Sequence, residues 1–260
     1  MINVVKLGGD IIFNKKLLIS SLKNFSKLDG YKIIVHGGGK IADLVSNQMG
    51  YNMKIINGRR ITDKTTLEIV VMTYSGLINK KIVSKLQSLG LNPIGFSGAD
   101  GNLVKSYKRS IKKIDYGNVG NLTINSINTD LIKSLFRIGI IPVLSPITHD
   151  GNGNLLNTNA DTIASYLSIS LSKTYKVILS YCFNKLGVLK NLKDENSYYY
   201  KIEETLFQKL KNKKIINKGM IPKLENAFYA LKNGVSKVTI SHPNYLNHPT
   251  KKTILCLGLG

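Results

Sequence analysis

Residues 2–9, INVVKLGG, decide the fold of this chain. Branched apolar side chains predict a buried strand, and two adjacent glycines follow that strand directly. Residues 32–39, KIIVHGGG, repeat the pattern, with three glycines before a helical run. Because glycine has no Cβ, both strands end where the backbone can come very close to another group. Lys6 lies within the first strand, and burying its charge would require an anionic partner.

Strand and helix patterns alternate along the rest of the 260 residues. Alternation of this kind is typical of an α/β fold in which helices cover both faces of a mostly parallel sheet. Ligands of such sheets bind at the carboxyl ends of the strands, where both glycine clusters lie. The expected strands are residues 2–9, 32–39, 92–98, 140–146, 176–181, 237–242 and 252–258. The expected helices are residues 40–50, 65–90, 129–139 with Thr129 as the N-cap, 160–171 and 222–234.

Composition limits the class of protein. With 43% hydrophobic residues the chain can bury a full core, and we expect a single domain over residues 1–260. The lysine-rich segment near residue 172 is the best position for a boundary between two lobes. The sequence has no apolar run long enough to cross a membrane and no secretion signal, so a cytoplasmic protein without a membrane partner is expected. Cys182 and Cys256 form no metal-binding pattern and are interpreted as reduced core residues.

The formal charge of +22, from 37 basic and 15 acidic residues, would ordinarily suggest a nucleic-acid partner. Most of the lysines, however, lie on predicted helix faces and in turns. Only residues 105–116, KSYKRSIKKIDY, interleave basic and aromatic side chains, and a solvated surface hairpin is the favoured interpretation of that segment. We therefore expect no nucleic-acid partner, although the charge could help to gather anionic substrates.

Glycine clusters before helices are typical of anion sites, because the free amides of a helix start bind phosphate. Neither cluster matches GxxxxGK[ST] or the GxGxxG dinucleotide fingerprint. Lys223 lies at a predicted helix start, where its charge opposes the helix dipole, so a ligand and chance placement are equal alternatives. Asn157, Asn159 and Asp161 precede another helix, and capping explains one of the three. Together these parts suit phosphoryl transfer.

Eight ordered stretches carry a family resemblance: VVKLGG, IVHGGG, NGRRITDKTTLEIV, SGLINKKIV, GFSGADGNL, DYGNVGNL, IPVLSPITHDGNGNLLNTNADTIA and GMIPKLENAFYALKNGV. The chain resembles the acetylglutamate kinases of the amino-acid kinase superfamily, closest to the Bacteroidetes-type branch. KLGG and GGG occur across that superfamily, whereas GRRIT, NTNAD and GMIPK in this order are far more specific to the acetylglutamate branch.

The resemblance implies a three-layer αβα sandwich and ATP-dependent phosphorylation of the side-chain carboxylate of N-acetyl-L-glutamate, the second step of arginine biosynthesis. The Mg²⁺ would be held by the nucleotide and not by protein side chains. Residues 1–170 would form the acylglutamate-binding and dimerisation lobe, and residues 171–260 the nucleotide-binding lobe. Because the first strand begins almost at Met1, without the extra helix of arginine-inhibited relatives, a homodimer without arginine feedback is expected.

The resemblance also assigns site residues. The two lysines, Lys6 and Lys223, would bind the phosphoryl oxygens, and Asp161 would hold both of them in place. The backbone amides of Gly8, Gly9 and Gly38 would bind the phosphates. Gly38 and Gly39 would also contact the acylglutamate. Arg60 and Asn157 would bind the α-carboxylate and the amide region of the acylglutamate. A side-chain carboxylate is ionised at neutral pH, so no general base is needed, and His36 is interpreted as a packed or positioning residue.

Two departures from the family pattern leave alternatives open. Tyr181 and Cys182 stand where many relatives have a TDV-like segment near the nucleotide, so no nucleotide contact is assigned there. Lys252 and Thr253 replace a Gly-Thr pair before the last strand. The acyl group is acetyl or succinyl, and another acylated amino acid is the alternative acceptor. A basic binding or regulatory protein that lost turnover is the remaining alternative, and its binding would weaken steeply with salt.

Overall fold

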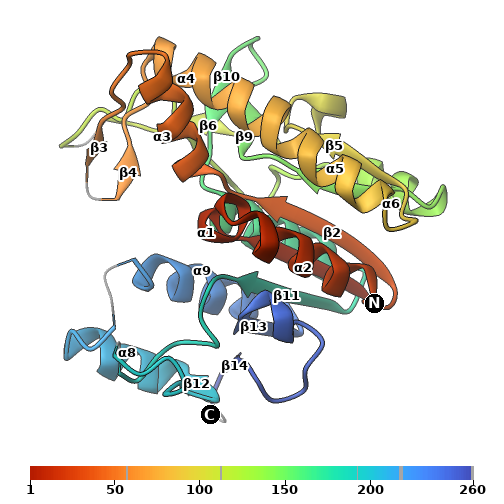
Figure 1. Cartoon of the computed structure of the whole chain (residues 1–260), viewed down its shortest axis with the longest axis vertical. Coiled ribbons are helices and arrows are strands. Elements are labelled where there is room, and N and C mark those ends of the chain that lie inside the picture. The colour runs from red at the N-terminus through yellow and green to blue at the C-terminus, as the bar shows by residue number, and fades with distance from the viewer. Residues whose placement is uncertain (57, 112, 192, 217–218, 259–260) are drawn as a thin grey trace.

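The computed structural model describes residues 1–56, 58–111, 113–191, 193–216 and 219–258. Its centre is an eight-stranded sheet of order β12-β14-β13-β11-β1-β2-β8-β5 (Figure 1). Neighbouring strands are parallel except β13 and β14, which are antiparallel. The strands are β1 (Ile2–Leu7), β2 (Tyr31–His36), β5 (Pro93–Phe96), β8 (Ile141–Leu144), β11 (Val177–Cys182), β12 (Lys201–Glu203), β13 (Lys237–Ser241) and β14 (Thr253–Cys256).

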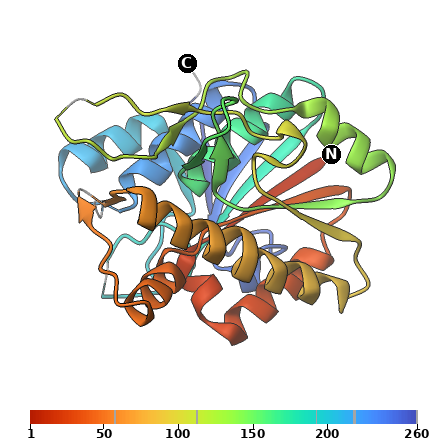
Figure 2. The ribbon, with the colours of Figure 1, turned by 90° about the horizontal axis from the view of Figure 1, so that it is seen from above.

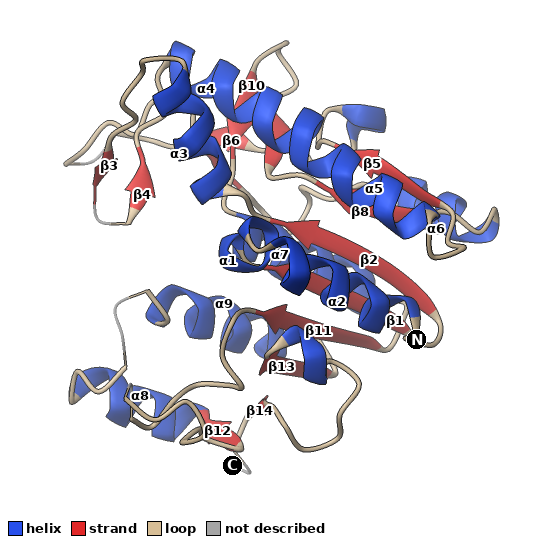
Figure 3. Cartoon of the chain, viewed as in Figure 1, coloured by secondary structure: helices blue, strands red, loops and turns tan. Residues whose placement is uncertain are grey.

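Helices cover both faces of this sheet, so the expected three-layer αβα sandwich is confirmed (Figures 2 and 3). One face carries α1 (Gly9–Phe13), α2 (Lys15–Ser26), α3 (Gly39–Gln48), α4 (Lys64–Val71), the π-helix η1 (Met72–Ile78) and α5 (Asn79–Gln87). The other face carries α6 (Thr129–Arg137), α7 (Ala160–Ser172), α8 (Glu204–Asn212) and α9 (Ile221–Lys232).

Short elements complete the described part of the chain. Three antiparallel hairpins pair β3 (Ile55–Ile56) with β4 (Arg59–Arg60), β6 (Tyr107–Lys108) with β7 (Gly120–Asn121), and β9 (Ile147–His149) with β10 (Leu155–Asn157). Two 3₁₀ turns are η2 (Asp100–Asn102) and η3 (Pro243–Tyr245). No helix in the described part of the chain has the length and apolarity needed to cross a bilayer.

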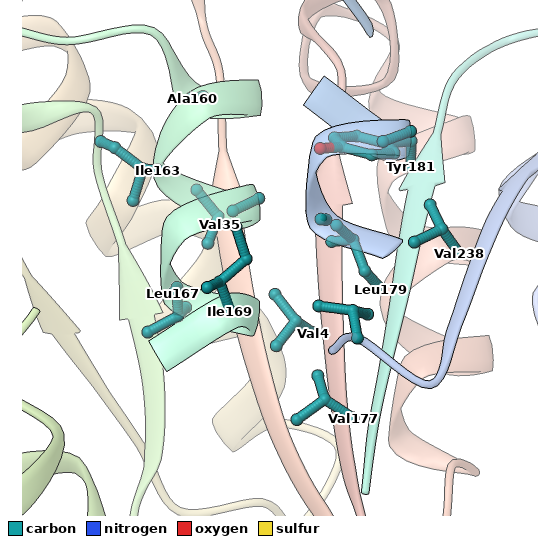
Figure 4. Packing of buried hydrophobic residues seen from close by; sticks show 14 of the residues in the cluster. Val4, Val35, Ala160, Ile163, Leu167, Ile169, Val177, Leu179, Tyr181 and Val238 are labelled. Atoms are coloured by element: carbon teal, nitrogen blue, oxygen red, sulfur yellow. The ribbon is translucent and has the colours of Figure 1, made fainter. Parts of the chain in front are cut away.

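The alternation of side chains along each strand divides the interior into two cores. Val4 and Leu179 belong to the core under α7 and α9, which Figure 4 shows from close by. Their neighbour Val5 points the other way and packs in the core under α2 and α5. Every residue of β1 is buried, because this strand lies in the middle of the sheet with helices on both sides.

The structure corrects several expectations about elements. Asn128 caps α6 by accepting a hydrogen bond from the Leu131 amide, and Thr129 is the first helical residue instead of the cap. The predicted helix over residues 65–90 is continuous but contains the wider π-helical turns of η1. The three-residue strand β12 was not expected.

Other expectations concern single residues. Both cysteines are free thiols, but only Cys182 is a core residue, because Cys256 is half-buried. Lys252 is buried and its Nζ donates to the Leu246 carbonyl oxygen at 3.0 Å, which closes the turn before β14. The hairpin expected around residues 105–116 is present, although its second strand, β7, begins later.

We predict that Ile163→Ala lowers the free energy of unfolding by about 2–5 kcal/mol, because the truncation leaves a cavity under the sheet. Ile163 is fully buried in α7, whereas Ile138, which is 69% exposed after α6, provides the matched control. Ile138→Ala should change stability by less than about 0.5 kcal/mol. Urea denaturation of both variants tests this difference, and equal losses would contradict the core assignment.

Candidate active site

The two glycine clusters lie side by side at the carboxyl ends of β1 and β2. The parallel register pairs Leu7 with His36, so the residues after each strand turn away at the same edge of the sheet. A cavity of about 290 Å³ opens there. Its lining comprises Lys6, Gly9, Gly37, Gly38, Gly39, Ile55, Gly58, Arg59, Arg60, Tyr74, Val119, Pro146, Asn157, Thr158, Asn159, Ala160 and Asp161.

Three glycine amides at this edge are available to a ligand. Gly9 begins α1 and Gly39 begins α3, so their N–H groups have no partner within their own helices. In the described part of the chain, the amides of Gly9, Gly38 and Gly39 donate to no protein acceptor. The Gly8 amide differs, because it donates to the Cys182 carbonyl oxygen at 3.0 Å. The phosphate contact expected from Gly8 therefore does not fit this geometry.

Steric contacts divide the glycines in another way. A Cβ on Gly8 would lie 3.1 Å from the Cys182 carbonyl oxygen, and one on Gly38 would lie 2.3 Å from Ile78 Cδ1. The protein's own packing thus accounts for these two glycines. A Cβ on Gly9 or Gly39 would meet its nearest neighbour at 3.8 Å or 3.6 Å, which is ordinary contact. Packing within the chain does not account for Gly9 or Gly39.

Three charged side chains from distant parts of the sequence meet beside this cavity. Lys6 Nζ, on β1, lies 2.6 Å from Asp161 Oδ1, and Lys223 Nζ, on α9, lies 2.9 Å from Asp161 Oδ2. The side chains of Lys6 and Asp161 are 8% and 9% exposed, and that of Lys223 is 26% exposed. Asp161 belongs to the first turn of α7, and Asn159 caps that helix. The three groups, called the ion triad below, carry a net charge of +1.

Burial and charge act against each other within the ion triad. Burial alone would raise the pKa of Asp161, but Lys6 and Lys223 outweigh it and lower that pKa to about 2. Burial lowers the pKa of Lys6, and the neighbouring Asp161 carboxylate partly restores it. Asp161 is therefore ionised at neutral pH and neutralises one of the two cations.

Arg60 and Asn157 line the same cavity. Arg60 Nη1 pairs with Asp43 Oδ1 at 2.6 Å, and its Nη2 donates to the Gly39 carbonyl oxygen at 3.4 Å. Asn157 Nδ2 donates to Thr62 Oγ1 at 3.1 Å. Both side chains are thus oriented by the protein while they line the cavity.

His36 is held as a neutral, positioning residue. Its Nδ1 lies 2.9 Å from the Gly37 carbonyl oxygen, and its Nε2 lies 3.2 Å from the amide nitrogen of Asn79. Burial lowers the pKa of His36 to about 4, so the ring is neutral at pH 7. A neutral ring donates from Nδ1 and accepts at Nε2, which fixes the backbone at the start of the second glycine cluster.

Sequence reasoning missed the π-helix residues that shape this site. Tyr74 and Ile78 pack against Gly38, and Tyr74 also lines the cavity. The tyrosine is 5% exposed, and burial raises its pKa. The apolar period of the helix indicated burial of this segment, but only the π-helical turns bring both side chains to the glycines.

A second cavity of about 240 Å³ lies on the other side of Lys223. It is mostly apolar, with Val188, Leu189, Ile215, Ile216 and Met220 among its lining residues, together with Phe183, Lys185, Gly187, Gly219 and Lys223. Lys223 thus lines this cavity while its ammonium reaches Asp161 in the first one. Tyr181 belongs to the lining of neither cavity, because its ring is buried in the core.

The chemistry of these groups fits a nucleoside triphosphate. Unpaired amides and two ammonium groups suit phosphates, and an apolar cavity next to them suits a base. The part of the chain that the structure describes contains no group of three or more His, Cys, Asp or Glu placed to hold a metal ion.

An αβα sandwich with such a cation-lined cleft defines a class of small-molecule kinases, and the comparisons agree. The amino acid kinase family model matches residues 1–242, so this chain belongs to that family. The acetylglutamate kinase of Bacteroides fragilis is 45% identical over 92% of this chain and 91% of its own length. That of Cytophaga hutchinsonii is 49% identical over 91% of this chain and 89% of its own length. The family resemblance drawn from the sequence motifs is confirmed.

Solved structures agree with the fold. The crystal structure of smu.665 from Streptococcus mutans has a TM-score of 0.82 and 28% identity, and the match covers 99% of each chain. Giardia carbamate kinase has a TM-score of 0.70 at 11% identity and covers 98% of each chain, which supports the fold alone.

We predict that Asp161→Asn lowers the free energy of unfolding by about 3–5 kcal/mol at pH 7, because the buried Lys6 and the partly buried Lys223 lose their shared anion. The folded pKa of Asp161, about 2, lies below its ordinary value of 3.8. Its stabilisation is therefore complete above about pH 4 and is lost as the pH falls towards 2. Urea denaturation across this range should show a smaller acid loss in the variant than in the wild type.

The matched control is Asp130→Asn, since Asp130 pairs with Lys133 at the surface and its side chain is 90% exposed. Its stability at pH 7 should stay within about 0.5 kcal/mol of the wild type. If the free energy of unfolding of Asp161→Asn falls in acid as much as that of the wild type, the pKa of Asp161 is not lowered in the folded protein.

Proposed function

We propose that this chain is an acetylglutamate kinase. It transfers the γ-phosphoryl group of ATP to the side-chain carboxylate of N-acetyl-L-glutamate and forms N-acetylglutamyl 5-phosphate, the second step of arginine biosynthesis. The observation that carries this proposal is the ion triad, in which Lys6 and Asp161 line the first cavity and Lys223 lines the second. The names of the relatives support the choice of substrate.

The acceptor carboxylate is already ionised at neutral pH, so the reaction needs alignment and charge stabilisation more than a base. Each ammonium group has three N–H donors and pairs with one oxygen of Asp161, which leaves donors for phosphoryl oxygens. The free amides of Gly9, Gly38 and Gly39 add fixed dipoles from the facing turns. These groups stabilise the charge that develops on the transferred phosphoryl group.

The acylglutamate binds in the first cavity. Arg60 offers its guanidinium to the α-carboxylate, and its existing pair with the half-exposed Asp43 holds it in orientation. Asn157 and the backbone of Gly38 and Gly39 contact the amide region of the substrate. Acetyl and succinyl groups are both chemically compatible with these contacts, so the acyl group is decided by experiment.

ATP occupies the second cavity with its phosphates toward Lys223 and the glycine turns. Mg²⁺ held by the nucleotide phosphates would supply part of the charge neutralisation there. Residues 1–170 then act as the acylglutamate-binding and dimerisation lobe, and residues 171–260 as the nucleotide-binding lobe. We also assign the enzyme to the cytoplasm as a homodimer, and the exposed apolar side chains of Leu44, Met72 and Leu77 in the first lobe support the position of the dimer contact.

The direct test measures ATP-dependent acyl phosphate, trapped with hydroxylamine, from N-acetyl-, N-succinyl- and unacylated glutamate. We expect product from an acylated substrate and a loss of about a hundredfold or more in Lys6→Ala, because a donor to the transition state is removed. Lys223 still pairs with Asp161 in this variant, so it should fold. Lys232→Ala, which removes a surface lysine of α9, should keep wild-type activity. No product from any of the three substrates would contradict the proposal.

A second prediction concerns Gly9→Ala. The added methyl group meets only ordinary contacts in the protein, so stability should stay within about 1 kcal/mol of the wild type. It enters the space proposed for phosphate, and kcat/KM should fall about tenfold or more. Thermal denaturation and steady-state kinetics separate the two effects. Gly76→Ala, at an exposed helical glycine with open space around its Cβ position, serves as the control and should be active. Wild-type kinetics in Gly9→Ala would remove this turn from the phosphate site.

A further inference from the structure

A buried hydroxyl pair lies one helical turn behind the ion triad. Tyr181 stands next to Lys6 in the sheet, because β1 and β11 pair these two residues in register. Its hydroxyl oxygen lies 2.6 Å from Ser165 Oγ and 3.2 Å from the carbonyl oxygen of Asp161. Figure 4 shows the Tyr181 ring among core side chains, with its hydroxyl oxygen on the side that faces α7.

Ser165 extends this contact to the second helix of the site. Its Oγ also lies 3.1 Å from the carbonyl oxygen of Asn226 in α9. Asp161 and Ser165 are four residues apart in α7, and Lys223 and Asn226 are three apart in α9, so each pair shares a helix face. One hydroxyl pair therefore joins β11 to α7 and α9, the two helices that carry Asp161 and Lys223.

The two hydroxyl groups have too few protons to fill all their contacts at once, so they hold one helix or the other. Two hydroxyl groups supply two protons for three contacts: Tyr181 with Ser165, Tyr181 with Asp161, and Ser165 with Asn226. When Ser165 donates to Tyr181, the tyrosine donates to the Asp161 carbonyl and holds α7. When Tyr181 donates to Ser165, the serine donates to Asn226 and holds α9. Both arrangements fill the short contact between the two hydroxyls.

Burial keeps the tyrosine in its protonated form. Tyr181 is 1% exposed and Ser165 is fully buried. Burial raises the pKa of Tyr181 above its ordinary value, and the Asp161 carboxylate raises it further. The hydroxyl therefore keeps its proton for donation at neutral pH. Because both side chains are buried, this hydroxyl pair lies away from solvent.

We propose that Tyr181 and Ser165 are positioning residues that set where Asp161 holds Lys6 and Lys223 during phosphoryl transfer. This inference rests on the proposed function and adds to it a role for Tyr181, which stands with Cys182 in place of the TDV-like segment. The pair touches neither substrate, since Tyr181 lines neither cavity. Its effect is expected in the transition state, where small displacements of the two ammonium groups matter most.

The test compares Tyr181→Phe, Ser165→Ala and the double variant. Tyr181→Phe keeps the ring and leaves Ser165 its acceptor on Asn226, so the fold should be retained. We expect kcat to fall about tenfold while KM for both substrates stays within about twofold, because only transition-state contacts are lost. The double variant should lie within about twofold of the slower single variant, because the two hydroxyls act as one unit.

The matched control is Ser168→Ala. Ser168 is equally buried in the same helix, but its Oγ donates to the Ala164 carbonyl within that helix. Wild-type kcat in this variant is expected. A kcat within about twofold of the wild type in Tyr181→Phe, losses that multiply in the double variant, or an equal loss in Ser168→Ala would each overturn the inference.

Hydrogen exchange provides a readout that needs no substrate. In Tyr181→Phe, amide exchange should rise about threefold or more in residues 160–166 and 223–228 and stay unchanged elsewhere, because those helix turns lose their shared anchor. A uniform rise, or none, would overturn the inference. If the wild type forms no acyl phosphate from any substrate, the proposed function fails, and the exchange result alone decides whether the hydroxyl pair anchors the two helices.

Discussion

The buried carboxylate of Asp161 is the constraint on which the rest of the structure depends. It neutralises one of two cations that come from opposite ends of the chain, Lys6 on β1 and Lys223 on α9. Without this shared anion, neither the buried Lys6 nor the partly buried Lys223 could leave water at low cost. The central strand, the helix after β10 and the helix before β13 must therefore all be in place before the site has its charge balance, so folding and the assembly of the site are the same event.

In the proposed mechanism, the backbone and the side chains contribute in different ways. Helix starts at Gly9 and Gly39 supply amides whose positions are fixed by the strands before them. The lysines supply charge, but their long side chains need the carboxylate to hold them still. A lysine side chain loses conformational entropy when it is fixed in place, whereas the backbone of a folded turn is already fixed. An ammonium group that is held in position stabilises developing charge more effectively than a mobile one. This difference explains why the lysines carry a dedicated anchor and the glycines do not.

The sequence predicted the layers of the fold for physical reasons, and it singled out residues that the structure brings to one cavity. Buried strands have apolar runs, and a lysine inside such a run, as at Lys6, requires an explanation. The use of the Gly8 amide could not be predicted, because its acceptor on Cys182 is about 170 residues away in the chain and depends on the register of β11. Tyr181 was read only as a departure from a family pattern, since its contacts with α7 follow from the packing of that helix on the sheet. Side chains that act across elements leave no local signal.

The position of β1 in the sheet has a consequence for synthesis on the ribosome. Its first neighbour, β2, is made within the next 30 residues, but its second neighbour, β11, begins only at Val177. At about 5–20 residues per second, one edge of the central strand waits roughly ten seconds or more for its partner. An unpaired apolar edge of this kind is open to wrong pairing with other chains. During that interval the net charge of +22 opposes association of the nascent chain with its neighbours.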